Sequence, residues 1–117
     1  GPNAALTALA ASGLPTDKFL YLGFLAAKTS SRRKAFQQWI DFPGTLVLYE
    51  SKHRITKCLA DMEDVFGAER CTCVAREMTK LHESFHVGTL EFVRQSVLAG
   101  SLKGEFVILV APRDYHL

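Results

Sequence analysis

The sequence lacks the features of a membrane protein and of a disulfide-stabilised secreted domain. Its longest unbroken apolar run, residues 106–111, is far too short to cross a bilayer, which takes about 20 residues. The 3 cysteines are an odd number, so we expect free thiols and a reducing compartment. No basic region precedes the first apolar stretch, so we expect no secretion signal. These absences favour a cytoplasmic protein without a membrane partner.

The common signatures of phosphate-binding and hydrolytic enzymes are also absent. The chain has no P-loop, no G-x-G-x-x-G and no nucleophile elbow, and no spacing of Ser, His and Asp singles out a catalytic triad. The net charge of +2 is too small to indicate a partner. The positions of the charged residues must therefore carry the functional argument.

The composition predicts one folded domain over residues 1–117. The chain is 48% apolar and 22% charged, which is enough apolar surface for one core. Its start, Gly1-Pro2-Asn3, has no initiator Met and resembles a loop that enters a helix. Gly1-Pro2 is either a protease scar or native sequence from within a longer protein, and the residues alone leave both readings open.

Helical and strand patterns alternate along the chain. Apolar spacing and glycine stops predict helices at 3–12, 29–42, 51–66 and 89–99. Aromatic and aliphatic runs predict strands at 18–25, 45–49, 71–75, 84–87 and 105–111, with a connection of six to eight residues before the fourth. The order α-β-α-β-α-β-β-α-β predicts an α/β fold in which helices flank a mixed five-stranded sheet.

Helical crossovers join the first three strands, so these strands should run parallel. Their carboxyl ends then lie at one edge of the sheet, where open α/β sheets bind their ligands. Glu50, Arg76 and Glu77 should therefore lie together at this edge, close to the turn at Gly104.

Four cations crowd the start of the second helix: Lys28, Arg32, Arg33 and Lys34. The helix dipole disfavours cations at an N-terminus, so an anion such as phosphate would explain their placement. Replacing Arg32 and Arg33 should then leave stability unchanged or raise it. The alternative is a solvated loop tip.

Two further charged clusters follow the next two strands. Glu50 could accept hydrogen bonds from a ribose or an amine, or could simply pair with Arg54. Lys80 could act as a general base if burial lowered its pKa, with Glu77 or Glu83 orienting it. A solvated run of surface charges is the alternative for this second cluster.

One pattern resembles a zinc site, with Cys71-x-Cys73 followed by His82-x-x-x-His86. Structural zinc sites usually have two to four residues between their cysteines, and these two cysteines fall on one face of a predicted strand. We therefore expect Cys71 and Cys73 to be buried and the protein to hold no metal.

Short segments spread over nearly the whole chain together resemble one family. They are GPNA at 1–4, SGLPTDKF at 12–19, GFL at 23–25, RRK at 32–34, TLVLYES at 45–51, ARE at 75–77, GTL at 88–90 and KGE at 103–105. Their order and spacing are similar to the C-terminal half of small-subunit ribosomal RNA cytidine 2′-O-methyltransferases, in the tetrapyrrole (corrin/porphyrin) methylase superfamily. Asn3 stands where Ser is common, and Ala26-Ala27 replaces a pair that contains proline.

The resemblance implies a two-domain enzyme that binds S-adenosylmethionine between its halves, of which this chain is the C-terminal domain and the N-terminal domain is missing. The positions that match the family's cofactor contacts are Pro2, Asn3, Ala4, Tyr49, Glu50, Ala75, Arg76, Glu77, Gly104 and Glu105. Residues expected to face RNA are Lys28, Arg32, Arg33, Lys34, His53 and Arg54. Lys80 is our choice of base, although the resemblance does not settle it.

The leading expectation is half of an S-adenosylmethionine-dependent methyltransferase that acts on ribosomal RNA or the small ribosomal subunit, with a homodimer left open. The first alternative is a non-catalytic module that binds RNA or a protein. The second is a tetrapyrrole methylase, whose substrate carboxylates would also be attracted to cations. An upstream N-terminal domain in the gene product would favour the enzyme over the binding module.

Overall fold

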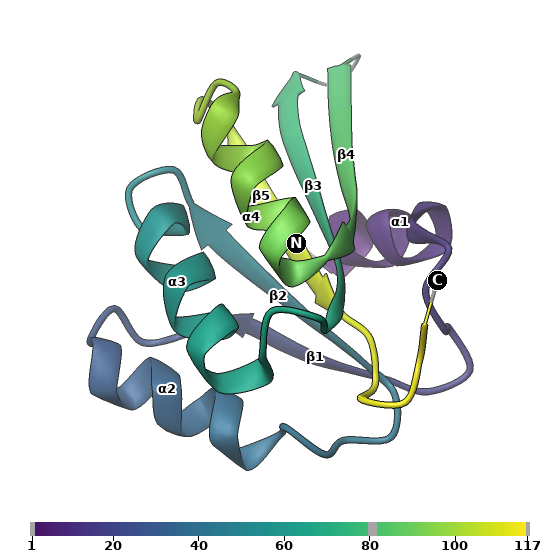
Figure 1. The fold of residues 1–117 in the computed structure, drawn as a ribbon. Helices are drawn as coiled ribbons and strands as arrows, with labels where there is room; N and C mark the ends of the chain where they lie inside the picture. Colours follow the sequence, from purple (N-terminus) through teal and green to yellow (C-terminus); the bar gives the residue numbers. More distant parts are fainter. Residues whose placement is uncertain (1, 80–81, 117) are drawn as a thin grey trace.

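The structure is a computed structural model that describes residues 2–79 and 82–116. Its helices are Pro2–Ser12 (α1), Thr29–Gln38 (α2), Ile55–Phe66 (α3) and Leu90–Ala99 (α4). Its strands are Phe19–Phe24 (β1), Thr45–Ser51 (β2), Cys71–Thr79 (β3), His82–Thr89 (β4) and Glu105–Val110 (β5). The strands form one sheet in the order β1-β2-β5-β3-β4 (Figure 1).

The sheet is mixed, as predicted. β1 and β2 pair in parallel, whereas β5 lies between β2 and β3 and is antiparallel to both. The first three strands therefore share one direction although β3 does not touch β2. β3 and β4 form an antiparallel pair at the other end of the sheet.

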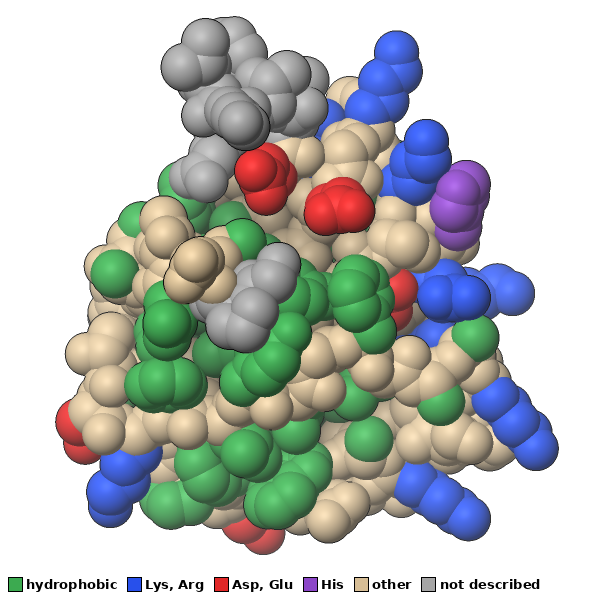
Figure 2. All heavy atoms as spheres, turned by 180° about the vertical axis from the view of Figure 1, so that it is seen from behind, with side chains coloured by type: hydrophobic (Ala, Val, Ile, Leu, Met, Phe, Trp, Pro, Cys, Tyr) green, Lys and Arg blue, Asp and Glu red, His purple; other side chains and the backbone are tan. Residues whose placement is uncertain are grey.

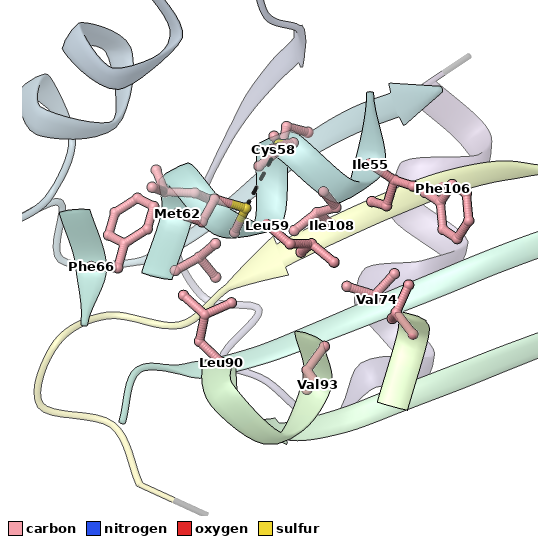
Figure 3. Close-up of a cluster of buried hydrophobic side chains, with 14 of the residues drawn as sticks. Ile55, Cys58, Leu59, Met62, Phe66, Val74, Leu90, Val93, Phe106 and Ile108 are labelled. Atoms are coloured by element: carbon pink, nitrogen blue, oxygen red, sulfur yellow. Dashed lines mark hydrogen bonds between the residues drawn. The ribbon is translucent and has the colours of Figure 1, made fainter. Parts of the chain in front are cut away.

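Helices cover both faces of the sheet (Figure 1). On one face, α2, α3 and α4 bury a large apolar cluster that includes Leu59, Phe106 and Ile108 (Figure 3). On the other face, α1 packs over a second cluster that includes Val47 and Leu109. Adjacent residues of β2 and β5 thus enter different cores, which explains why the all-apolar β5 is buried on both sides.

Two predicted helix boundaries were wrong, and strand pairing explains one of them. The third helix begins at Ile55 rather than at Ser51, because Ser51 still belongs to β2 and pairs with Glu105. Lys52, His53 and Arg54 form the turn between them. The second helix ends at Gln38 rather than at residue 42.

The predicted connection before the fourth strand was also wrong. β3 continues to Thr79 and β4 already begins at His82, so the two strands form a long hairpin. β5 pairs with β3 only as far as Glu77, so beyond that residue the hairpin's own two strands pair with each other alone. Within the described residues, no helix is long and apolar enough to cross a membrane.

Candidate functional site at the carboxyl edge of the sheet

The strand register brings the predicted residues to one edge, as expected. Glu50 of β2 and Arg76 of β3 lie on either side of Phe106, their common neighbour on β5. Ser51 and Glu77 likewise flank Glu105, one residue after the turn at Gly104. The prediction that Glu50, Arg76 and Glu77 share one edge near Gly104 is confirmed.

The same register divides these residues between the two faces of the sheet. Side chains alternate along a strand, so Tyr49, Glu77 and Glu105 lie on the α1 face, while Glu50 and Arg76 lie on the opposite face. The expectation of one shared polar site is therefore wrong for Glu50 and Arg76, because the sheet separates them from the others.

Glu50 and Arg76 have partners within the protein on their own face. Glu50 is only 3% exposed, and its carboxylate accepts a hydrogen bond of 2.8 Å from the Ser51 N–H. Arg76 donates to the Ser84 hydroxyl at 3.3 Å and to the Lys103 carbonyl at 3.2 Å. The two contacts of Arg76 join β3 to β4 and to the turn before β5, whereas the contact of Glu50 is local to the end of β2.

A cavity of about 250 Å³ opens on the α1 face. Its lining combines aromatic rings, carboxylates and the first turn of α1: Ala4, Phe24, Tyr49, Glu77, Glu105, Phe106 and Val107. Figure 2 views this face and shows hydrophobic side chains at the centre with acidic side chains directly above them. We call this cavity the edge pocket. It gathers four of the ten predicted cofactor residues: Ala4, Tyr49, Glu77 and Glu105.

Three side chains of the edge pocket have distinctive surroundings: those of Tyr49, Glu77 and Glu105. The Tyr49 hydroxyl accepts a hydrogen bond of 3.2 Å from the Ala5 N–H, which ties α1 to β2, and burial raises the pKa of Tyr49. Glu77 and Glu105 are direct cross-strand neighbours, an arrangement in which like charges repel. A cationic or hydrogen-bond-donating ligand would relieve that repulsion.

The sequence missed three residues of the edge pocket: Phe24, Phe106 and Val107. Phe106 and Val107 follow the predicted Glu105 and were interpreted only as core. The sequence placed Phe24 in a strand but did not indicate on which face of the sheet its side chain lies. In the structure, the centroid of its ring lies 5.3 Å from that of the Tyr49 ring. Gly23, directly before it, was the available signal.

The remaining predicted cofactor residues lie around this edge, whereas the predicted base lies outside the described part. Pro2 and Asn3 are in the first turn of α1, and Ala75 is a buried residue of β3. Gly104 has φ +97°, a backbone conformation that favours glycine in the turn before β5. The predicted base Lys80 lies outside the described residues, so its role stays a prediction.

Arg32 is not the exposed cation that the sequence predicted. Its side chain is 1% exposed, and its Nη2 lies 2.7 Å from Oδ2 of Asp61 on α3. Its Nε donates to the same oxygen at 3.1 Å, and its Nη1 donates to the Ala27 carbonyl at 3.2 Å. The prediction that Arg32 faces RNA is inconsistent with this burial.

Arg33 also has carboxylate partners, at 3.1 Å in Asp64 and at 3.4 Å in Asp61. Hydrogen bonding to Asp64 is the main reason that the pKa of Arg33 is raised. The helix-dipole argument overlooked these acids because they lie on α3, 28 or more residues away in the sequence.

The other cations stay exposed where β1 and β2 end. They are Lys28, Lys34, His53 and Arg54 from the prediction, with Lys52 and Lys57 in addition. We call this group the basic edge; basic side chains gather along one side of the face shown in Figure 2. Within residues 2–79 and 82–116, no ion pair is found for any of its Lys or Arg side chains.

Cys71 and Cys73 are buried strand residues, as predicted, with exposures of 4% and 0%. Burial raises the pKa of Cys73 to about 12, so its thiol is a poor nucleophile and a poor metal ligand. In the described part of the chain, no three His, Cys, Asp or Glu residues are grouped as metal ligands would be. His82, the third residue of the zinc pattern, adjoins the undescribed residues 80–81.

The fold is shared with parts of two solved structures. Cobalt precorrin-4 methyltransferase CbiF, a cobalamin biosynthetic enzyme, superposes with a TM-score of 0.66 at 12% identity, over 92% of this chain and 48% of that one. The methyltransferase CobJ gives a TM-score of 0.62 at 19% identity, over 92% and 46%. Sequence identities this low indicate a shared fold but do not indicate a shared function.

The sequence model of the Tetrapyrrole (Corrin/Porphyrin) Methylases matches residues 1–93, and the chain belongs to this family. The family resemblance found in the sequence is thereby confirmed. Similar proteins include "Ribosomal RNA small subunit methyltransferase I" of Xylella fastidiosa (strain Temecula1), which is 44% identical over 94% of this chain and 41% of its own length. The proteins of the same name from Escherichia coli O157:H7 and Pseudomonas aeruginosa are 45% and 43% identical, over 39% and 40% of their lengths. The chain therefore spans about two fifths of these relatives.

Proposed function

We propose that this chain forms one half of an S-adenosylmethionine-dependent enzyme that methylates the 2′-hydroxyl of a cytidine in small-subunit ribosomal RNA. The observation that carries the proposal is the edge pocket. It brings together Ala4, Tyr49, Glu77 and Glu105, which come from four separate segments and were assigned to the cofactor by resemblance. The name that the similar proteins share supports the choice of RNA as the substrate.

The edge pocket suits this cofactor in both its polar and its apolar lining. S-adenosylmethionine, when bound, supplies an electrophilic methyl group on a positively charged sulfur. Glu77 and Glu105 would accept hydrogen bonds from its hydroxyl or ammonium groups and favour its positive charge. Phe24, Tyr49 and Val107 would exclude water from its apolar parts.

The size of the edge pocket fits a site that another part of a longer protein completes. Its volume of about 250 Å³ is below the range of roughly 300–1,000 Å³ typical of small-molecule sites. In relatives more than twice as long as this chain, the remaining residues could supply the opposite wall. The proposed N-terminal domain would take this place.

Methyl transfer to a ribose also requires a base, because the attacking 2′-oxygen must lose its proton. Lys80 remains our proposal for this base, and it follows Glu77 by three positions in the sequence. The neutral lysine amine would take the proton of the 2′-hydroxyl, and S-adenosylmethionine, when bound, would supply the methyl group and keep the electron pair of the broken sulfur–carbon bond as S-adenosylhomocysteine.

We propose that the basic edge holds RNA phosphates beside the edge pocket. The two sets of cations precede or begin α2 and α3, where free backbone N–H groups add to the attraction for anions. Lys28, Lys34, His53 and Arg54 keep their proposed role. Lys52 and Lys57 join them, whereas Arg32 and Arg33 serve the contact between α2 and α3.

The test is transfer of a labelled methyl group by the full-length product of the native gene. We expect label on the ribose of one small-subunit RNA cytidine, with either the free RNA or the small ribosomal subunit as substrate and a tetrapyrrole unlabelled. Label on the tetrapyrrole alone would support the small-molecule alternative, and RNA binding without any transfer would support the binding module. The proposed location is the cytoplasm, and the question of a homodimer stays open.

A further inference from the structure

β1 contains an irregularity immediately before the edge pocket. Tyr21 pairs with Val47, but the next two pairs are Gly23 with Leu48 and Phe24 with Tyr49, so Leu22 is an extra residue in β1. Gly23 has φ +66°, in the left-handed region that glycine adopts without strain. This is a β-bulge, a device that re-aims the side chains after it and is frequent beside active sites. We call it the Gly23 bulge.

The Gly23 bulge changes the face on which Phe24 lies. In a regular strand, Tyr21 and Phe24 would point to opposite faces because they are three residues apart. Here both rings lie on the α1 face beside Tyr49, with ring centroids 5.7 Å and 5.3 Å from that of Tyr49. Leu20 and Leu22 pack into the core on the other side.

The Phe24 side chain is unusually exposed for a strand residue whose ring packs against another aromatic ring. It is 61% exposed, although an ordinary strand register would have carried it to the face where Leu20 and Leu22 are partly buried. One side of the ring is in contact with Tyr49, and the ring lines the edge pocket. A flat apolar surface held at the rim of a cavity is suited to stack on a planar ligand group.

We propose that the Gly23 bulge presents Phe24 as a stacking platform for the adenine ring of the ligand in the edge pocket. The inference rests on the proposed function, which supplies the identity of the ligand. Base–aromatic stacking of this kind tolerates any planar base and needs no hydrogen-bond partner on the ring.

The strand order also gives the bound ligand a direction. Phe24 and Tyr49 line the pocket from β1 and β2, whereas Glu105 and Glu77 line it from β5 and β3. Three strand spacings separate β1 from β3, about 14 Å in all. The base then lies over the aromatic end, and the cationic sulfur and amine lie toward the two carboxylates.

Isothermal titration calorimetry on the full-length product of the native gene tests the platform. The probes are S-adenosylhomocysteine and adenosine, which share the base and lack the charged sulfur, and S-adenosylmethionine is titrated for comparison. We expect F24L to weaken both by about tenfold, within the range known for base–aromatic stacking, and F24W to restore them. F92L is the matched control, since the Phe92 side chain on α4 has a similar exposed fraction, 55%. It should leave both affinities unchanged.

The outcomes separate this inference from the proposed function. A wild-type protein that binds neither probe would contradict the proposed cofactor itself. Wild-type binding that F24L does not weaken would overturn the platform while leaving the cofactor intact. If F24L weakened S-adenosylmethionine alone, the ring would face the sulfonium instead of the base, which also overturns the proposal. Circular dichroism of F24L and F24W checks that each variant is folded.

Discussion

A buried arginine between two helices explains how α2 is held against α3. Arg32 is 1% exposed and directs two N–H groups at one oxygen of Asp61, with a third at the Ala27 carbonyl. Cations at a helix start are unfavourable when the helix is considered alone. The acid on the neighbouring helix reverses that balance, so the energetics of Arg32 depend on a partner that no local pattern reveals.

We predict that R32A destabilises the protein by about 3 kcal/mol, because it removes one partner of a buried ion pair and leaves Asp61 without its nearest cation. This reverses the expectation from the sequence that the change would be neutral or stabilising. Urea unfolding followed by circular dichroism measures it. The control is R33A at the half-exposed neighbour, which should change stability little. Equal stability of R32A and wild type would contradict the buried pair.

The buried thiols should make stability fall at alkaline pH. Burial raises the pKa of Cys73 from 9.0 to about 12, so the unfolded thiol ionises before the folded one does. This contribution is complete below about pH 9 and is lost as the pH rises toward 12. We predict that the free energy of unfolding decreases between pH 9 and 11, and less steeply in C73A than in wild type. Identical slopes in the two proteins would show that Cys73 is not the titrating group.

At the scale of elements, the sequence predicted what depends on nearby residues. The apolar run 105–111 corresponds closely to the observed β5, Glu105–Val110, because a strand buried on both faces has an unmistakable composition. The start of α3 was misplaced because Ser51 is fixed in β2 by its pairing with Glu105. Residues 76–79 were missed as strand because their charges suggested a loop, while β4 supplies their partners.

The Gly23 bulge shows why part of the site could not be predicted. Alternation along β1 places Tyr21 and Phe24 on opposite faces, and only the register with β2 shows otherwise. The convergence of Glu50, Arg76 and Glu77 at one edge followed from the element order alone. Which face of the sheet each of these side chains occupies depends on the register of its strand with the neighbouring strands, and that register is set by tertiary structure.

We predict that G23A destabilises the protein by about 1–2 kcal/mol, because an L-residue at φ +66° is strained. Gly100 supplies the control, since its φ of −101° is open to any residue and G100A should be neutral or slightly stabilising. Thermal unfolding of the two variants measures the difference. Equal midpoints would mean that the bulge does not need glycine.

The starts of α2 and α3 together form the basic edge, and we predict that it governs RNA affinity. In the full-length product of the native gene, K28A/K34A should weaken RNA binding and lower the log–log salt slope by about 0.7–0.9 for each lost phosphate contact. R33A is the control, because its guanidinium is already paired with Asp64 and Asp61. Filter binding at several salt concentrations provides the slopes. A larger loss for R33A than for K28A/K34A would contradict our assignment.

At the scale of the whole molecule, the chain has the internal organisation of an independent domain. Apolar clusters fill both faces of the sheet, and the radius of gyration of 12.7 Å agrees with about 13 Å expected for a folded domain of this length. The edge pocket, in contrast, is small and lies beside an exposed ring and two neighbouring carboxylates. The two apolar clusters therefore stabilise the fold, whereas the proposed catalysis depends on the edge pocket.

We predict that residues 1–117 fold cooperatively on their own but transfer no methyl group. The two cores need no further residues, whereas the proposed cofactor is larger than the edge pocket and would stay partly in water, where its methyl group and the ribose are not held in register. Urea unfolding with a single transition tests the first half of the prediction, and labelled S-adenosylmethionine with small-subunit RNA tests the second. The full-length product of the native gene, assayed in parallel, is the positive control. Turnover by residues 1–117 at a rate near that of the longer protein would show that the edge pocket is already complete, and the proposal of a site shared between two halves would have to be abandoned.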